Sequence, residues 1–459
     1  MRKNFLAIWL FILAIAFTGC SGWPAGAGQT EKPETMVTVI KHVNILTMEN
    51  DIILPNQTVL MKNGVITEIR DTDSIKVPEG CEEIDAEGKY LIPGIIDMHT
   101  HIVDSNDLTL FLCNGVTTIR NMAEYPDVEK YPDSFQSTLN YTDALTLRNK
   151  INSGELAGPQ IVQAGHVLDG DPPFHEALCT PLVEGSDIDS IVKSEKEKGY
   201  DYIKVYWNLP ETDFNAIVQA AEKYGMKVVG HVPASIKYEE AIGSMYSIEH
   251  LTGMYDGASI MPDLGRLIQR ANETGTWHCP TLIEIRNLLP IDNPNFIALQ
   301  NRPENKYIKE DLKEFWNKEI VRWGGLTGYA GEAMDYFQML VGELHKGGVR
   351  IVAGTDCGVM PYVLPGFSIH EEMELLTTCG LSNYEALKAA TIDAAKCLDQ
   401  DDRIGSIAVG KKADIVLIDG DPLQDIKNTR KISGVMYNGK WLSEQRIKEL
   451  LDSIADSIQ

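Results

Sequence analysis

The chain has no excess of positive charge. Its 459 residues include 41 Lys and Arg against 66 Asp and Glu, so the formal net charge at pH 7 is −25. Nucleic-acid binding depends on a basic face that neutralises phosphates, and this charge balance therefore argues against nucleic acid as a partner. The acidic charge does not identify a substrate, because net surface charge mainly governs solubility and steering.

The apolar run near the N-terminus is too short to span a membrane. Residues 5–17 are almost wholly apolar and follow a charged Met-Arg-Lys start, which is typical of a secretory signal peptide. The run leads to Thr18-Gly-Cys20, which resembles a bacterial lipobox except that Phe17 replaces the usual Leu. We therefore predict a lipoprotein signal peptide over residues 1–20, with lipid attached to Cys20. The alternative is ordinary cleavage after the small residues 25–27.

These features predict a protein that is exported from a bacterial cytoplasm and anchored to a membrane by its lipid, facing the periplasm. Residues 21–35, rich in Gly, Pro and polar residues, would form a flexible tether. The other seven cysteines are irregularly spaced, without Cys-x-x-Cys pairs. This odd number predicts mostly buried free thiols, although a periplasmic location would permit a disulfide.

Six residues suited to one metal site each lie at the downstream end of a short apolar run. They are His99, His101, Lys204, His231, His250 and Asp356. Along a strand, residues two apart point to the same face, so the first two imidazoles can bind one ion. The pattern is more informative than any one of these residues, because a single histidine at a strand end is usually a packing residue.

Strand-like runs alternate with helical periodicity over residues 91–403. Besides the five runs that end in these six residues, residues 115–120, 160–165 and 277–282 read as strands, and residues 213–224 have helical periodicity. About eight such units predict an α/β fold of the (β/α)8 TIM-barrel type, whose active sites lie at the C-terminal ends of the strands. The six candidates would then end strands 1, 4, 5, 6 and 8 and face one pocket.

The ordered motifs resemble the metal-dependent amidohydrolase superfamily, in the branch of imidazolonepropionase-like enzymes and Xaa-Pro (prolidase-like) or Xaa-Arg/Lys dipeptidases. The resemblance covers nearly everything after Met36. The matching motifs are Pro93-Gly-Ile-Ile-Asp-Met-His-Thr-His101, Gly230-His-Val-Pro233, Ser247-Ile-Glu-His-Leu251, Ala353-Gly-Thr-Asp356 and the Gly- and Ala-rich stretch 405–418. The resemblance implies that residues 36–90 and 404–459, from both chain ends, join as a small β-sandwich domain beside the barrel.

The resemblance also implies a role for each candidate. His99, His101 and Asp356 would hold one divalent ion, and His231 and His250 a second. Lys204 would bridge them as N6-carboxylated lysine, because an ammonium has no acceptor for a cation. We expect two Zn2+ per chain, with Mn or Fe as alternatives.

The implied reaction is attack of a metal-bridging hydroxide on an amide carbonyl. Asp356 would be the catalytic proton shuttle, taking a proton from the nucleophile and passing it to the leaving nitrogen. The predicted substrate is a small amide, either a dipeptide or an N-acyl amino acid. For substrate contacts we predict Tyr206, which lies two residues beyond Lys204 on the same strand face, together with His175 and His370.

Two alternatives to this reaction stay open. One alternative is a mononuclear hydrolase of a cyclic amide such as an imidazolone, with Lys204 unmodified and paired with a carboxylate. The other is a lipid-anchored binding protein without catalysis. Asn121 stands where the superfamily often has Asp after Arg120, so a neutral amide replaces a charged carboxylate there. The sequence is also compatible with a homo-oligomer.

Overall fold

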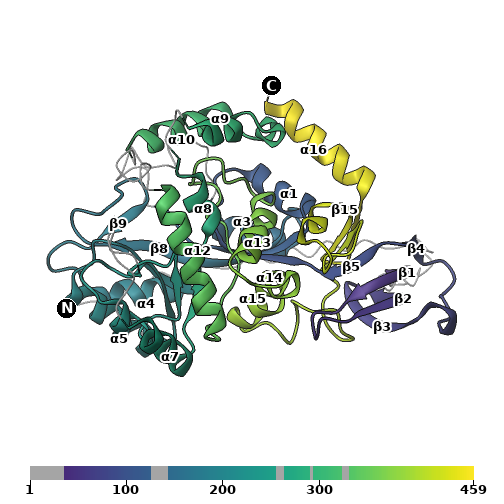
Figure 1. Cartoon of the computed structure of the whole chain (residues 1–459), viewed down its shortest axis with the longest axis horizontal. Helices are drawn as coiled ribbons and strands as arrows, with labels where there is room; N and C mark the ends of the chain where they lie inside the picture. The colour runs from purple at the N-terminus through teal and green to yellow at the C-terminus, as the bar shows by residue number, and fades with distance from the viewer. Residues whose placement is uncertain (1–35, 126–142, 255–262, 290–292, 323–329, 459) are drawn as a thin grey trace, which may run out of the picture. The chain divides into compact units, whose positions relative to one another are not determined.

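The computed structural model describes residues 36–125, 143–254, 263–289, 293–322 and 330–458 (Figure 1). The predicted signal peptide, Cys20 and the tether over residues 21–35 lie outside the described residues. No helix within the described ranges is long and apolar enough to cross a membrane.

The central element is a ring of parallel strands. Seven neighbouring strands occur in chain order: β6 (Ile95–Thr100), β7 (Val116–Asn121), β8 (Gln160–Asp169), β10 (Tyr202–Val205), β11 (Lys227–Gly230), β12 (Ser247–Glu249) and β13 (Trp277–Cys279). The short strand β9 (Cys179–Pro181) pairs with β8 outside the ring.

The predicted eighth strand closes the ring through individual backbone hydrogen bonds. The Val352 amide donates to the carbonyl oxygen of His278 in β13 at 2.9 Å, and the Met98 amide of β6 donates to the Ala353 carbonyl oxygen at 3.0 Å. Residues 350–353 therefore lie between the last and first strands. This arrangement confirms the predicted barrel.

Helices follow most of the strands. Their bounds are α1 (Ser105–Cys113), α3 (Ala144–Asn152), α4 (Ile188–Lys198), α5 (Glu211–Tyr224), α6 (Tyr238–Ala241), α7 (Leu264–Thr274), α8 (Leu282–Asn287), α9 (Pro294–Gln300), α10 (Glu310–Arg322), α12 (Ala330–Lys346), α13 (Ser368–Thr378), α14 (Asn383–Ala389), α15 (Ile392–Cys397) and α16 (Glu444–Ile458). Short 3-10 turns are η1 (Thr72–Ser74), η2 (Pro303–Tyr307) and η3 (Ile426–Arg430). Local sequence sets the ends: a capping box of Asp104 and Asp107 starts α1, and the left-handed Gly225 ends α5.

Both ends of the described chain contribute to a second sheet. Its strands are β1 (Val37–Leu46), β2 (Ile53–Lys62), β3 (Val65–Asp71), β4 (Glu82–Asp85), β5 (Tyr90–Pro93), β14 (Ile415–Ile418), β15 (Ile432–Tyr437) and β16 (Lys440–Ser443). The sheet order is β16-β15-β14-β5-β1-β2-β3, with β4 beside β1. The antiparallel β5–β14 pair joins the two halves of the chain. An antiparallel bridge between Val65 and Lys412 brings β3 back toward the start of β14, so the sheet curls.

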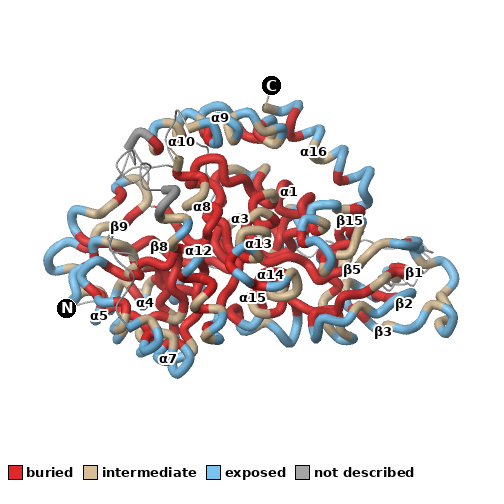
Figure 2. Tube along the Cα trace, viewed as in Figure 1, coloured by how far each residue is buried: buried red, intermediate tan, exposed pale blue. Residues whose placement is uncertain are grey.

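Strands at the centre of the curled sheet bury both faces. Leu91 and Leu417 face the core inside the sheet, whereas their neighbours Ile92 and Val416 belong to the core that the sheet shares with the barrel. Successive strand residues point to opposite faces, which explains this division. Figure 2 shows the buried segments concentrated through the barrel and along these strands.

Candidate metal centre

All six predicted ligands line one cavity at the C-terminal ends of the barrel strands. The cavity has a volume of about 640 Å³. His99 belongs to β6 and Lys204 to β10, while His231 and His250 directly follow β11 and β12. Active sites of (β/α)8 barrels lie at this end of the strands, so the fold places these side chains where chemistry is expected.

The imidazoles lie close to one another and to the carboxylate. Ring centroids are 4.5 Å apart for His99 and His250, 4.7 Å for His231 and His250, and 5.5 Å for His99 and His101. Asp356 Oδ1 lies 3.2 Å from His99 Nε2 and 3.0 Å from His101 Nε2. One ligand atom each from His99, His250 and Asp356 lies within 4.8 Å of the other two, close enough for metal coordination. This group joins His250 to two candidates that the sequence analysis assigned to the other ion.

The donor atoms at this site fit a divalent metal. Among the described residues, His99 Nε2, His231 Nδ1 and Asp356 Oδ1 are buried without a hydrogen bond of normal geometry. Buried polar atoms are almost always satisfied, because leaving one unpaired is costly. Nitrogen and carboxylate donors that converge without protein partners are suited to Zn2+, Mn2+ or Fe2+.

The protonation states of His99, His231 and Asp356 also suit metal binding, whereas the pKa of His250 is raised because the charge of Glu284 outweighs the effect of burial. Burial lowers the pKa of His99 to about 4, and burial, together with the neighbouring His250 and Lys204, lowers the pKa of His231 well below its usual range. Burial alone would raise the pKa of Asp356, but His99 and His101 hold it well below its usual range. Neutral imidazole and ionised carboxylate are the forms that bind metals.

Glu249 positions His99 from behind. Its Oε2 atom accepts a hydrogen bond from His99 Nδ1 at 2.8 Å, which leaves Nε2 facing the cavity. Its Oε1 atom pairs with Arg120 at 2.8 Å, and the Arg120 Nε–H donates to the Met98 carbonyl oxygen at 2.7 Å. A carboxylate behind a histidine fixes its tautomer and orientation. The sequence analysis missed this role, although Glu249 stands inside the Ser-Ile-Glu-His motif.

Glu284 orients the imidazole of His250 in the way that Glu249 orients that of His99. His250 Nδ1 lies 2.6 Å from Glu284 Oε2 and 2.7 Å from Thr281 Oγ1. Glu284 belongs to the short helix α8, which follows β13 and lies far from His250 in sequence. No local pattern marks it, and this second missed residue required the tertiary structure.

Lys204 has none of the protein partners that would make it a structural ion pair. It is 2% exposed, and no ion pair or hydrogen bond joins its side chain to another of the described residues, although the charges of Glu249 and Asp356 act on it. Burial lowers its pKa, which favours the neutral amine. The described residues therefore give no support to the alternative in which Lys204 pairs with a carboxylate, and its carboxylation stays a prediction.

Two predicted ligands have a strained backbone. His250 and Asp356 have φ angles of 58° and 61°, in the left-handed region that non-glycine residues rarely adopt. Such strain costs on the order of 1–3 kcal/mol and clusters at functional sites, where the surrounding structure maintains it.

Glycine allows the closing segment to approach His99. A Cβ atom on Gly354 would lie 2.7 Å from the His99 backbone nitrogen and 2.5 Å from Cys279 Sγ. Gly230 has a φ of 125°, and a Cβ there would lie 2.3 Å from the Val205 carbonyl oxygen. The glycines in the Ala-Gly-Thr-Asp and Gly-His-Val-Pro motifs are therefore needed for packing around the ligands.

The predicted substrate contacts divide into two groups. Tyr206 and His175 line the cavity; the Tyr206 ring centroid lies 4.1 Å from that of His231, and His175 Nε2 lies 3.2 Å from Glu319 Oε2. His370 is not among the lining residues that the structure describes. It is buried in α13, where Nε2 donates to the Asn114 carbonyl oxygen at 3.1 Å and Nδ1 lies 2.9 Å from Thr429 Oγ1. The structure therefore does not support the prediction that His370 contacts substrate; its side chain instead packs between α13 and its neighbours.

Asn121 is a fully hydrogen-bonded core amide. Its Nδ2 group donates to the Ala123 carbonyl oxygen at 2.8 Å and to Gln163 Oε1 at 2.9 Å, and its Oδ1 accepts from the Ile102 amide at 2.8 Å. An aspartate could not make the two donations. Asn at this position is therefore matched to its surroundings.

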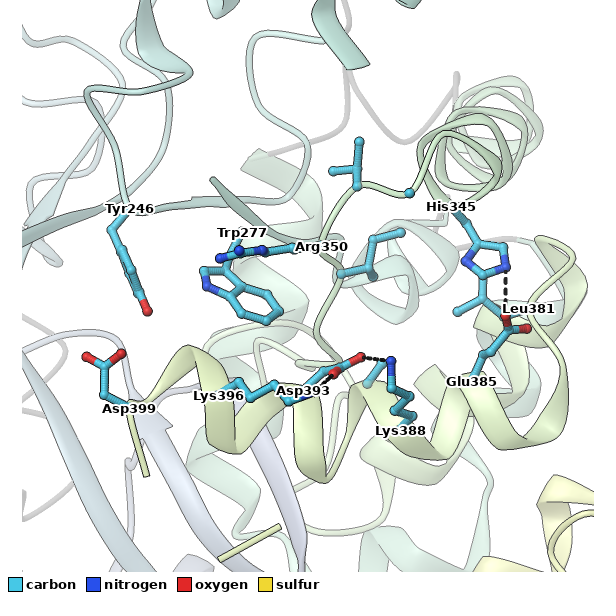
Figure 3. A pocket seen from close by; sticks show the side chains of 14 residues that line it. Tyr246, Trp277, His345, Arg350, Leu381, Glu385, Lys388, Asp393, Lys396 and Asp399 are labelled. Carbon is cyan, nitrogen blue, oxygen red and sulfur yellow. Dashed lines mark hydrogen bonds and ion pairs between the residues drawn. The ribbon is translucent and has the colours of Figure 1, made fainter. Parts of the chain in front are cut away.

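A second cavity, of about 760 Å³, lies at the other end of the strands, near Tyr246 and Trp277, which precede β12 or begin β13. Its charged side chains are largely paired with one another, as Lys388 with Asp393 and His345 with Glu385 (Figure 3). None of the described residues that line it is a predicted ligand. The candidate catalytic cavity is therefore the one lined by the four predicted histidine ligands.

Comparisons with known proteins point the same way. The model of the Amidohydrolase family matches residues 90–442. The imidazolonepropionase of Alkaliphilus metalliredigens is 22% identical over 80% of this chain and 85% of the relative. A 5-methylthioadenosine/S-adenosylhomocysteine deaminase of Thermoanaerobacter pseudethanolicus is 35% identical over 91% of this chain and 96% of the relative. A crystal structure of a Xaa-Pro dipeptidase with bound methionine in its active site has a TM-score of 0.66 at 21% identity, over 89% of this chain and 100% of that one, a likeness of fold.

Proposed function

The chain belongs to the amidohydrolase family and is a hydrolase of carbon–nitrogen bonds, and from this premise we propose that it cleaves the amide bond of a small molecule of the dipeptide or N-acyl amino acid type. The observation that carries the proposal is the convergence of four histidines, Lys204 and Asp356 in one cavity. The unpaired buried donors among them support metal binding.

In this proposal His99, His101 and Asp356 would hold one divalent ion, and His231 and His250 would hold a second. Lys204, carboxylated on its Nζ atom, would supply a further anionic ligand. When bound, such ions lower the pKa of water and polarise a carbonyl group, which supplies a nucleophile near neutral pH. The buried, unpaired Lys204 supports the carboxylated form, because only the neutral amine can react with carbon dioxide.

The protein's own groups have defined tasks in this reaction. Asp356 is ionised at neutral pH because His99 and His101 lower its pKa, so it can accept a proton from water and return it to the leaving nitrogen. Tyr206 keeps its proton because burial raises its pKa well above the usual value. Its hydroxyl group can therefore donate a hydrogen bond to the developing oxyanion.

Hydrolysis of a cyclic amide is the second candidate, and the similarity to imidazolonepropionase supports it. It differs from the first in using one ion and an unmodified Lys204. The lack of a carboxylate partner for Lys204 favours the first candidate. The non-catalytic binding protein is set aside, because the chain belongs to a family of hydrolases.

The test combines metal content with turnover on protein lacking residues 1–20. We expect about two metal ions per chain and hydrolysis of members of a panel of dipeptides and N-acyl amino acids. His231→Asn and Asp356→Asn should remove nearly all turnover and leave the circular dichroism spectrum unchanged. His42→Asn, at an exposed histidine outside the cavity, is the matched control. One ion per chain with turnover only on cyclic amides would overturn the first candidate in favour of the second.

We also propose that the enzyme is exported and anchored through lipid on Cys20. The support is the charged start, the apolar run and the Thr-Gly-Cys sequence. In a bacterial host the full chain should collect in the membrane fraction, and Cys20→Ser should release it. Cys81→Ser, at a cysteine inside the folded chain, should leave it there. Equal distribution of all three proteins would contradict the anchor.

A further inference from the structure

The short helix α8 is not capped by the residue that precedes it. Thr281 stands at the capping position with a φ of 47°, in the left-handed region, and its side chain accepts no hydrogen bond from the amides of α8. Its Oγ1 atom lies 2.7 Å from His250 Nδ1 and 3.0 Å from Glu284 Oε2 instead. The amides of the first turn therefore need another acceptor.

Glu372 of α13 supplies this acceptor from outside the helix. Its Oε1 atom accepts a hydrogen bond from the Leu282 amide at 3.0 Å, and its Oε2 atom accepts one from the Ile283 amide at 2.8 Å. All three residues are completely buried, so bulk water cannot replace these bonds. Burial raises the pKa of Glu372 to about 8, and the two amides oppose this shift because they stabilise the carboxylate.

The capped helix carries the groups that hold His250. Glu284, in the first turn of α8, lies 2.6 Å from His250 Nδ1, and Thr281 contacts the same atom from the residue before the helix. Nε2 is therefore the ring nitrogen left to face the cavity that His250 lines. Because the backbone of His250 is itself left-handed, its orientation depends on such tertiary contacts.

We propose that Glu372 is a positioning residue for His250: it caps α8 from α13, which leaves the Thr281 hydroxyl group free to hold the imidazole and fixes Glu284 beside it. The proposal deepens the proposed function and rests on it, since His250 is there a metal ligand. Groups behind a ligating histidine affect metal affinity by fixing its orientation. Glu372 extends this support by one further step, through the helix.

The first test uses the metal-free protein and needs no substrate. Selective 13C labelling of the imidazole Cε1 atom gives one NMR signal for each of the 10 histidines, and His250→Asn identifies that of His250. Glu372→Gln places an NH2 group where one oxygen accepts, so we expect the His250 signal to shift while that of His42, in the curled sheet, stays. Glu374→Gln, on the same helix but paired with Arg430, should leave the His250 signal in place. An unmoved His250 signal in Glu372→Gln would overturn the proposal.

Glu372→Asp covers the case in which Glu372→Gln does not fold. It keeps the carboxylate and shortens the side chain by one methylene group, so it loses the reach to the amides of α8. The same shift of the His250 signal is expected, and its absence would count equally against the proposal.

The second test separates positioning from general stabilisation of the fold, by measuring metal affinity in competition with a chelator. Glu372→Gln should weaken metal binding about tenfold. Its effect should not add to that of Glu284→Gln, because both changes act through α8 on His250. It should multiply with that of Glu249→Gln, which acts on His99 from β12. Equal behaviour of the two pairs would contradict a route through α8.

This inference and the proposed function fail in different ways. A shifted His250 signal and weakened metal binding in a protein that hydrolyses no amide would refute amide hydrolysis and leave the role of Glu372 intact. Amide hydrolysis with an unmoved His250 signal in Glu372→Gln would do the opposite.

Discussion

At the scale of single residues, the site depends on groups that do not face the substrate. Glu249 lies between His99 and Arg120, with all three side chains completely buried. A buried carboxylate is tolerated because Arg120 balances its charge, while its second oxygen orients the histidine. The identity of the predicted ligands thus explains only part of the site.

Glu249→Gln should weaken metal binding about 10- to 100-fold, because the amide is a weaker acceptor for His99 and leaves Arg120 uncompensated. Metal affinity measured by competition with a chelator checks this expectation. Glu240→Gln, at an exposed position, is the control and should bind metal as the wild type does. Wild-type affinity in Glu249→Gln would show that His99 needs no such support.

His370 should make the stability of the fold depend on pH. Burial lowers its pKa from 6.5 to about 4 in the folded chain. Between these values the unfolded chain binds a proton that the folded chain does not, so the free energy of unfolding falls as the pH drops, by at most ~1.4 kcal/mol per pH unit. Urea unfolding between pH 7 and 5 should show a shallower decline for His370→Gln. An equal decline of the free energy of unfolding in the wild type and in His370→Gln would show that His370 does not contribute to the pH dependence.

At the scale of elements, the segment that closes the barrel is held by individual backbone hydrogen bonds to β13 and β6 and by close contact with His99. Gly354 lets it pass against His99, where the predicted ligand Asp356 follows two residues later. The close approach and the left-handed Asp356 together hold the carboxylate beside the histidines. A small change in this segment should therefore affect the metal site directly.

Gly354→Ala should reduce the metal content of the purified protein and lower the free energy of unfolding by about 1–3 kcal/mol, because the new methyl group overlaps His99 and Cys279. Elemental analysis and urea unfolding measure both effects. Gly265→Ala, in α7 where a Cβ meets nothing within 4 Å, should keep the metal and the stability. Full metal content in Gly354→Ala would mean that the segment can shift without cost.

The elements also show how far sequence reasoning reaches. Strands β6, β7, β8 and β10–β13 occur at the predicted positions, because apolar runs between helical segments are strong local signals. The six candidates meet in one cavity, although their role as ligands stays a prediction. Glu284 could not be found from the sequence, since its contact with His250 depends on how α8 packs. His370 was predicted to contact substrate, but it packs against Asn114 and Thr429. The sequence cannot distinguish these positions, because a histidine after the closing segment has the same local pattern whether it faces the cavity or the core.

At the scale of the molecule, the barrel and the curled sheet share structure. The strands β1, β5 and β14 have side chains in the core inside the sheet and in the core shared with the barrel. Loss of these strands from the curled sheet would expose apolar surface of the barrel. The described chain from residue 36 onward should therefore behave as one cooperative unit.

Urea unfolding of the metal-free protein should show one transition. The unfolding curves from tryptophan fluorescence and from hydrogen exchange of peptides in β1–β3 should have the same midpoint urea concentration. The reason is that the shared strands couple the curled sheet to the barrel. Earlier exchange in β1–β3, with unchanged fluorescence, would show that the curled sheet unfolds separately.

The pairing of β5 with β14 also has a consequence for biosynthesis. Next to this pair, Lys89 binds Asp419, and these two residues are 330 positions apart. While the chain leaves the ribosome, β5 is an open sheet edge, and its partner is made only near the end of translation. Folding of the sheet is therefore delayed until synthesis is nearly complete. An incomplete chain would keep this edge unpaired, a state that chaperones must protect from aggregation.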